Sequence, residues 1–170
     1  MHKGRIFPAI VLAAVMGLGF CKVATAADDR EICKTASGDT AIEACTRAIA
    51  SKKYKARKQR HTLSLLYTNR GVEYAKKRDF DKAIADHDQA IKLDPKNALA
   101  YNNRGNVYAA KGDTEHAIAD YDMAVKLDAK FAEALYNRGV AKRAKGDWTA
   151  GNADIDEARK LQPNIGAAAK

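Results

Sequence analysis

A gapless internal repeat of 34 residues is the feature that most constrains what this chain can fold into. Eleven of the 34 columns are identical in all three copies, including a glycine first seen at Gly71 and an acid first seen at Asp86. The copies span residues 64–97, 98–131 and 132–165. Self-similarity at this period indicates supersecondary units that stack on one another and bury a continuous core together.

Each copy has the pattern of two helices joined by a tight turn. In the second copy, small and aromatic residues recur at helical spacing on both sides of Gly112 and Asp113. A glycine can take the left-handed end of one helix, and an acid can begin the next. Pro95 and Pro163 then disfavour helix at the residue before them in copies one and three. Each copy is therefore predicted to be a helical hairpin.

These residues resemble the tetratricopeptide repeat, whose pattern is W-x2-L-G-x2-Y, then A-x3-F, A and P at a period of 34. The second copy carries the resemblance through Tyr101, Arg104, Gly105, Tyr108, Ala117, Tyr121 and Ala124. The resemblance implies an all-α fold, a short right-handed superhelical solenoid of three hairpins. It also implies that the first helices line a concave groove that binds a protein or peptide. Lys142 and Ile155 depart from the pattern in the third copy, as is typical of a terminal repeat.

All three copies place an arginine where the family pattern has leucine. A lone buried guanidinium would be costly, so each arginine is expected to have an acidic partner. An aspartate follows each arginine by 16 residues, beginning with Arg70 and Asp86. We predict an ion pair within each hairpin, with a role in structural specificity more than in net stability.

Residues 1–27 have the pattern of a secretory signal peptide. Lys3 and Arg5 precede an uncharged run from Ile6 to Phe20, and small residues follow at 24–26. The run is shorter than the roughly 20 residues that span a bilayer as a helix. Cleavage near Ala26 or Ala27 predicts an exported, periplasmic protein. It would also remove Lys3, Arg5 and Lys22, which lowers the net charge from +9 to +6.

The segment 28–63 is expected to form a shorter helical hairpin followed by a basic stretch, with its turn at residues 37–39. Cys33 and Cys45 are predicted to form a disulfide, as suits an oxidising compartment, and the alternative is two buried free thiols. Eight residues beyond one repeat period fall in residues 51–61, as added turns on the next helix or as a loop. After the repeats, only the tail 166–170 remains to cover the last hairpin. The alternative is that this open end pairs with another molecule.

A set of asparagines is the first candidate binding site, and it repeats with the period of the hairpins. Its members are Asn69, Asn102, Asn103, Asn106 and Asn137. An amide both donates and accepts hydrogen bonds, so it suits the backbone of a bound peptide. The alternative is that these side chains bond neighbouring helices within the solenoid. A clamp for a terminal carboxylate is not indicated, because Thr68, Val72, Tyr136 and Val140 occupy the places that would need basic residues.

A run of basic residues is the second candidate site. Its members are Lys52, Lys53, Lys55, Arg57, Lys58 and Arg60. Such a patch could bind anionic lipid or polysaccharide at the cell envelope, which is the alternative function. A solvated helix face or a linker would have the same composition.

Catalysis, cofactors and metals are not expected. The histidines outside the signal segment are His61, His87 and His116, and none pairs with a nucleophile at a recognisable spacing. His87 occupies an aromatic position of the repeat core. No glycine-rich phosphate loop appears, and two cysteines twelve apart do not make a metal site. Nucleic acid is an improbable partner for a mildly basic, exported chain.

Overall fold

The computed structural model describes residues 26–54 and 59–167. This part of the chain is helical throughout, with eight α-helices, one short 3-10 helix and no strand. The α-helices are α1 (Ala26–Thr35), α2 (Gly38–Ala50), α3 (Arg60–Lys76), α4 (Phe80–Leu93), α5 (Ala98–Ala110), α6 (Thr114–Leu127), α7 (Ala132–Ala144) and α8 (Trp148–Leu161). The predicted signal segment falls on residues outside this description. Among the described helices, none combines the length and the hydropathy needed to cross a bilayer.

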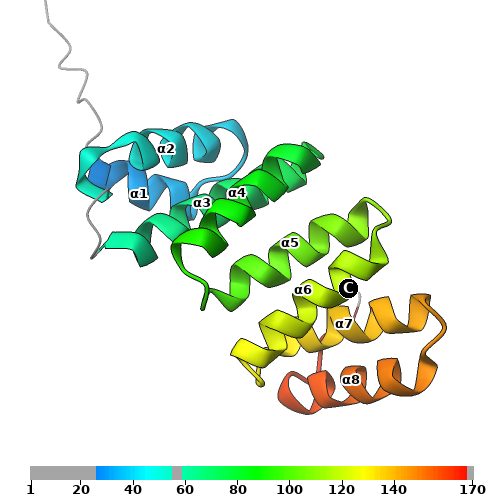
Figure 1. The fold of residues 1–170 in the computed structure, drawn as a ribbon. Helices are drawn as coiled ribbons and strands as arrows, with labels where there is room; N and C mark the ends of the chain where they lie inside the picture. Colours follow the sequence, from blue (N-terminus) through cyan, green and yellow to red (C-terminus); the bar gives the residue numbers. More distant parts are fainter. Residues whose placement is uncertain (1–25, 55–58, 168–170) are drawn as a thin grey trace, which may run out of the picture.

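The helices pair into four hairpins that stack in chain order, as Figure 1 shows from α1 and α2 to α7 and α8. Each second helix also packs against the first helix of the next hairpin. The first helices α1, α3, α5 and α7 contact one another in succession. They form one face of the stack, called the inner face here. The prediction of an all-α solenoid of repeated hairpins is confirmed.

Tight turns and acidic caps set the boundaries of the repeated helices. Asp79, Asp113 and Asp147 each precede a second helix and accept a hydrogen bond from a backbone N–H in its first turn. Gly112 lies in the left-handed region at φ 83° in the turn before Asp113. In the first repeat, Arg78 holds the corresponding place at φ 61°. The turn geometry is therefore kept even where the repeat lacks its glycine.

Small residues allow the two helices of each hairpin to cross closely. Ala83 and Ala90 on α4, like Ala117 and Ala124 on α6, are fully buried. A Cβ atom added to Gly105 would lie 2.7 Å from Cε1 of Tyr121, closer than side chains approach in folded proteins. The crossing therefore needs a glycine on the first helix opposite an aromatic ring on the second.

The predicted ion pairs are present in all three repeats, and each is bidentate. In the second repeat, Nε and Nη2 of Arg104 donate to the two carboxylate oxygens of Asp120 at 2.8 and 2.6 Å. The corresponding pairs are Arg70 with Asp86 and Arg138 with Asp154. The Asp120 side chain is only 7% exposed, so its pairing satisfies a charge that water barely reaches. The pair raises the pKa of the Arg104 guanidinium, chiefly through its hydrogen bond to Asp120.

The remaining guanidinium nitrogen of each arginine reaches the preceding hairpin. Nη1 of Arg104 donates to Asp88 at 2.5 Å, and Nη1 of Arg138 donates to Asp122 at 2.8 Å. In the first repeat, the acceptor is the hydroxyl of Thr46 on α2, at 3.0 Å. Each arginine therefore links its own hairpin to the one before it. This explains the second repeated acid, which sequence reasoning left without a role.

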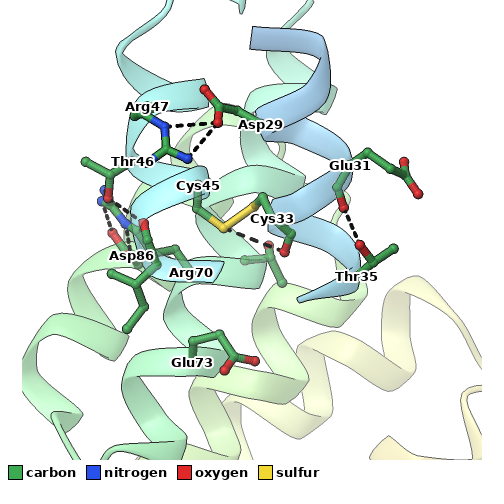
Figure 2. The surroundings of a disulfide bond; sticks show 12 residues. Asp29, Glu31, Cys33, Thr35, Cys45, Thr46, Arg47, Arg70, Glu73 and Asp86 are labelled. Carbon is green, nitrogen blue, oxygen red and sulfur yellow. Dashed lines mark hydrogen bonds and ion pairs between the residues drawn. A yellow bond between two sulfur atoms is a disulfide. The ribbon is translucent and has the colours of Figure 1, made fainter. Parts of the chain in front are cut away.

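The N-terminal hairpin is closed by the predicted disulfide, shown in Figure 2. Cys33 on α1 and Cys45 on α2 are bonded, and both are buried. Arg47 on α2 donates to Asp29 on α1 at 3.0 and 2.8 Å. The extra residues before the first repeat form a 3-10 helix, Lys52–Tyr54, and an additional turn at the start of α3. Both predicted forms, an added turn and a connecting loop, are therefore represented.

The C-terminal tail folds back over α7 instead of leaving the last hairpin fully open. Gly166 lies one repeat period after Ala132, the first residue of α7. It has φ 74°, and an added Cβ would lie 2.2 Å from the hydroxyl oxygen of Tyr136. The tail thus begins along the path of a further first helix. Trp148 remains 57% exposed at this end.

Candidate partner-binding face

Three hollows lie between consecutive first helices on the inner face. We name them by those helices: the α1–α3 hollow, the α3–α5 hollow and the α5–α7 hollow. Their volumes are about 440, 200 and 490 Å³. Each can admit side chains of a bound segment. Together they run along the inner face from the disulfide-bonded hairpin to the last repeat.

Four of the five candidate asparagines line these hollows. Asn69 lies in the α1–α3 hollow, and Asn103 in the α3–α5 hollow. Asn106 borders both the α3–α5 and the α5–α7 hollows, and Asn137 lines the latter. Asn102 differs, because it is only 1% exposed. Its side chain is beyond the reach of a partner in this structure.

Three of the asparagines form a network that joins two repeats. Nδ2 of Asn137 on α7 donates to Oδ1 of Asn102 at 3.2 Å and to Oδ1 of Asn106 at 3.0 Å. The hydroxyl of Tyr121 also donates to Oδ1 of Asn106, at 2.8 Å. These contacts are the structural alternative considered for the set. They hold α5 and α7 together and fix the floor of the α5–α7 hollow.

The other two asparagines keep polar atoms available to a partner. Asn69 makes no side-chain hydrogen bond within the described residues. The carbonyl oxygen of Asn103 accepts a long hydrogen bond from Asn102, at 3.4 Å, which leaves its Nδ2 group uncommitted among the described residues. The two amides occupy the same column of the repeat on adjacent helices. They are therefore the members of the set best placed to grip a peptide backbone.

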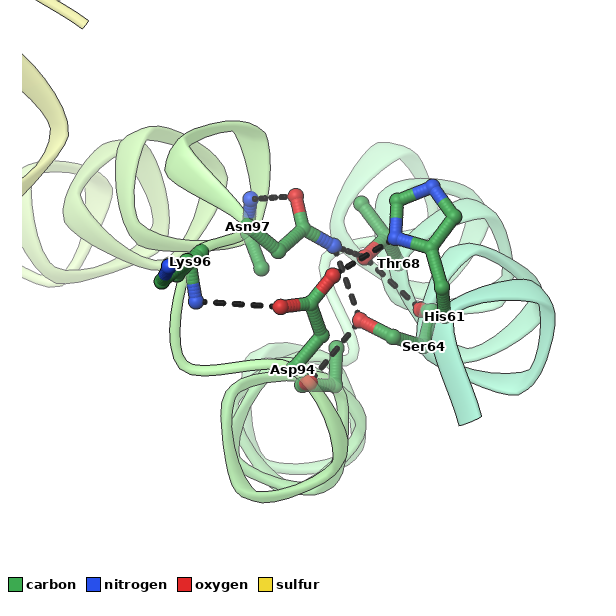
Figure 3. A network of polar contacts seen from close by, with 8 residues as sticks. His61, Ser64, Thr68, Asp94, Lys96 and Asn97 are labelled. Atoms are coloured by element: carbon green, nitrogen blue, oxygen red, sulfur yellow. Dashed lines mark hydrogen bonds and ion pairs between the residues drawn. The ribbon is translucent and has the colours of Figure 1, made fainter. Parts of the chain in front are cut away.

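A polar cluster at the first repeat junction, drawn in Figure 3, sets the spacing between α3 and α5. Asn97 caps α5, and its Nδ2 donates to Ser64 at 2.9 Å and to Thr68 at 3.2 Å. Beside it, Nδ1 of His61 lies 2.6 Å from Asp94. This hydrogen bond is the main cause of the lowered pKa of the Asp94 carboxyl. The sequence offered a signal for Asn97, since the other repeats have apolar residues in its column.

Only part of the predicted basic patch lies in the described residues. Lys52, Lys53 and Arg60 are exposed, and Arg60 donates to the backbone carbonyl of Lys92 at 3.1 Å. Lys55, Arg57 and Lys58 fall outside the described residues. Two other cations, which sequence reasoning missed, line the α1–α3 hollow. They are Arg30 and Lys34 on α1, and their spacing of four residues was the available signal.

The described residues offer no arrangement suited to metal binding. No group of three or more histidine, cysteine or acidic side chains is gathered there. His116 contacts Asp113 at 2.7 Å and stacks on Tyr108 at an exposed turn. His87 is fully buried in its aromatic position and lacks a hydrogen-bond partner among the described residues. Burial lowers its pKa to about 4, so His87 is neutral at pH 7.

Residues 71–112 and 105–146 match a family model described as TPR repeat. The chain carries tetratricopeptide repeats. The two matched TPR segments cover parts of all three 34-residue copies. Comparison with curated protein sequences gave no match.

Solved TPR structures share this arrangement. The first TPR domain of Spaghetti (RPAP3), bound to the HSP90 peptide SRMEEVD, is 25% identical, covering 62% of this chain and 84% of its own, with a TM-score of 0.61. The Arabidopsis OM64 TPR domain is 26% identical, covering 63% and 88% of the two chains, also with a TM-score of 0.61. MamA is 19% identical, covers 85% and 82%, and has a TM-score of 0.69. The likeness to MamA concerns the fold alone.

Proposed function

We propose that this protein is an exported, non-enzymatic adaptor that binds a segment of a protein or peptide partner along its inner face. The observation that carries the proposal is the placement of Asn69 and Asn103. Both line hollows on the face made by the first helices, and both keep amide groups available. The HSP90 peptide bound by a TPR domain of similar structure supports a peptide as the class of ligand.

The inner face would bind an extended segment with little rearrangement. Bidentate ion pairs and buried small residues hold the hairpins in place, so the protein loses little conformational freedom on binding. Amide groups on the first helices would bond the backbone of the segment. Apolar hollow residues such as Val72, Val107 and Val140 would contact its alternate side chains. Such a mode favours a partner of suitable shape and extended backbone.

The proposal of export rests on the signal pattern of residues 1–27 and on the disulfide. A bond between Cys33 and Cys45 is suited to an oxidising compartment such as the periplasm. We expect the mature protein from its native host to begin near Ala27 or Asp28. Amino-terminal sequencing that finds Lys3 and Arg5 retained would contradict export by cleavage.

A capture experiment tests the adaptor function directly. Mature protein carrying an affinity tag would be crosslinked in the cell envelope and compared with an Asn69→Ala/Asn103→Ala variant. The matched control is Asn152→Ala/Asn164→Ala, which removes two exposed amides elsewhere. We expect one partner to be captured by the wild type and the control and lost from the inner-face variant.

Equal capture by all three proteins would contradict the inner-face proposal. Repeating the capture at raised ionic strength then separates the remaining explanations. Binding through exposed basic residues such as Lys52 and Lys53 weakens steeply with salt, because exposed charges are screened. That result would favour docking on an anionic envelope surface.

A further inference from the structure

We propose that the α1–α3 hollow is a subsite for a carboxylate side chain of the bound segment, with an apolar residue beside it. The inference rests on the proposed function and names the chemistry of the partner. It assigns a role to α1, which lies outside the three repeats. The partner segment would therefore be acidic where it crosses the disulfide-bonded hairpin.

The hollow brings together cations from one helix and polar groups from the next. Arg30 and Lys34 lie one turn apart on α1, and both are exposed. Thr62 and Asn69 face them from α3. Neither Arg30 nor Lys34 pairs with an acid of the described chain. A carboxylate entering here would accept charge-assisted hydrogen bonds from the cations and a further one from an amide.

The acids nearest in the structure already have partners. Asp94, behind His61, accepts hydrogen bonds from that ring and from the backbone N–H of Lys96. Asp29 on α1 is bonded to Arg47. Glu73 on α3 accepts from Lys76 at 2.6 Å and from the backbone N–H of Gly38 at 2.7 Å. The lining of the α1–α3 hollow contains no acid, so the positive charge of its cations is left for a ligand.

Apolar surface beside the cations defines the second part of the subsite. Leu65 is 37% exposed and Leu66 is buried beneath it, and both line the hollow. The α5–α7 hollow at the other end of the inner face has no charged lining residue and contains Tyr136 and Val140. The two ends therefore differ in chemistry. This difference would orient a segment with its acidic part on α1 and its apolar part on α7.

The disulfide makes this subsite depend on redox state. Cys33 lies between Arg30 and Lys34 in the sequence of α1, and its bond to Cys45 ties that helix to α2. Reduction would release α1 and disperse the two cations. Carboxylate binding should then weaken, while the α5–α7 hollow, which is built from other repeats, should be unaffected.

The test is a titration of isotope-labelled mature protein followed residue by residue by NMR. The probe is the blocked tetrapeptide acetyl-Leu-Glu-Glu-Leu-amide, which carries side-chain carboxylates but no terminal one. The matched probe is acetyl-Leu-Gln-Gln-Leu-amide. We expect saturable shifts of the Asn69 side-chain amide and of the backbone at Arg30 and Lys34 with the acidic probe at concentrations up to about 1 mM. The neutral probe should bind about tenfold more weakly.

Charge-neutralising variants distinguish this subsite from general attraction to a basic protein. Arg30→Gln/Lys34→Gln should reduce the affinity for the acidic probe by about tenfold. The control Lys126→Gln/Arg159→Gln removes the same two charges from exposed positions on α6 and α8 and should change it less than about twofold. Reducing agent should weaken binding by the wild type to the level of the first variant.

Two outcomes would overturn the proposal. Shifts at Asn103 and Val140 without shifts at Arg30 and Lys34 would leave the inner face as a peptide site but remove the carboxylate subsite. Equal losses in both charge variants would show non-specific attraction, and the subsite would again be wrong. A lack of any inner-face shift with either probe would also reject it, whereas the adaptor function would still be judged by envelope capture.

Discussion

At the scale of single residues, His87 shows how the repeat core accepts an ionisable side chain. It fills the position held by Tyr121 and Ile155 in the other repeats, and it is fully buried. A Cβ added to Gly71 would lie 2.7 Å from its Cε1 atom, so the ring is packed against α3. Its nitrogens find no partner among the described residues. The neutral imidazole therefore serves as packing volume at the helix crossing.

This burial predicts a loss of stability in mild acid. Because the folded pKa is about 4 and an unfolded histidine titrates near 6.5, the unfolded state binds more protons between these values. The free energy of unfolding should therefore fall by roughly 3 kcal/mol as the pH drops from 7 to 4. Urea unfolding at several pH values measures this change. His87→Phe should remove most of the pH dependence between 4 and 6.5, and an unchanged pH profile in that variant would contradict the assignment.

Sequence alone could identify the asparagine set but could not sort its members. Asn102 and Asn103 are adjacent, yet a helix rotates successive side chains by about 100 degrees, so one points inward and the other toward the hollow. The burial of Asn102 also depends on α7, which packs over it from 30 residues further along the chain. Its hydrogen bond from Asn137 is set by this packing. The separation of structural from available amides therefore needed the tertiary arrangement.

At the scale of helices, the repeated arginine is the main polar link of the solenoid. Its pairing within a hairpin was predictable, because the aspartate follows at a constant spacing. The second link, from Arg104 back to Asp88, has the same spacing of 16 residues in the opposite direction. It was overlooked because a repeated acid two residues from another is also typical of a solvated helix face. Its identity in all three copies was the signal that distinguished it.

The two links of Arg104 should differ in energetic weight. Asp120→Asn leaves a partly buried guanidinium without its charged partner and should lower the free energy of unfolding by about 2 kcal/mol. Asp88→Asn removes a contact at a carboxylate that is 48% exposed and should cost less than about 1 kcal/mol. Thermal or urea unfolding of the two variants measures the difference. Equal effects, or no effect of Asp120→Asn, would show that the pairing within the hairpin is unimportant.

At the scale of the whole molecule, the period of the repeat determines most of the architecture. A gapless 34-residue period requires identical hairpins related by one constant step, so the stack follows directly from the alignment. The two ends could not be derived in this way. At the start, an added turn on α3 and a 3-10 helix absorb the eight extra residues. At the end, Gly166 begins the path of another repeat and covers Tyr136.

The disulfide should stabilise the N-terminal hairpin in particular. Closing a loop of this size contributes about 3 kcal/mol by restricting the unfolded chain. Reduction, or Cys33→Ser/Cys45→Ser, should therefore accelerate hydrogen exchange in α1 and α2 while residues 98–165 remain protected. Repeat arrays respond in this local way because each unit contacts mainly its neighbours. A uniform loss of protection along the chain would instead indicate a single cooperative unit.

Adaptor binding through the inner face is the central claim, and site-specific photo-crosslinking tests it most directly. A photoreactive residue would replace Val72 or Val140 on the first helices, or Lys126 or Ala153 on the second helices, in protein produced in its native envelope. The account predicts a discrete partner adduct from Val72 and Val140 and none from the other two positions. Adducts that form only from the second helices, or equally from all four positions, would contradict it.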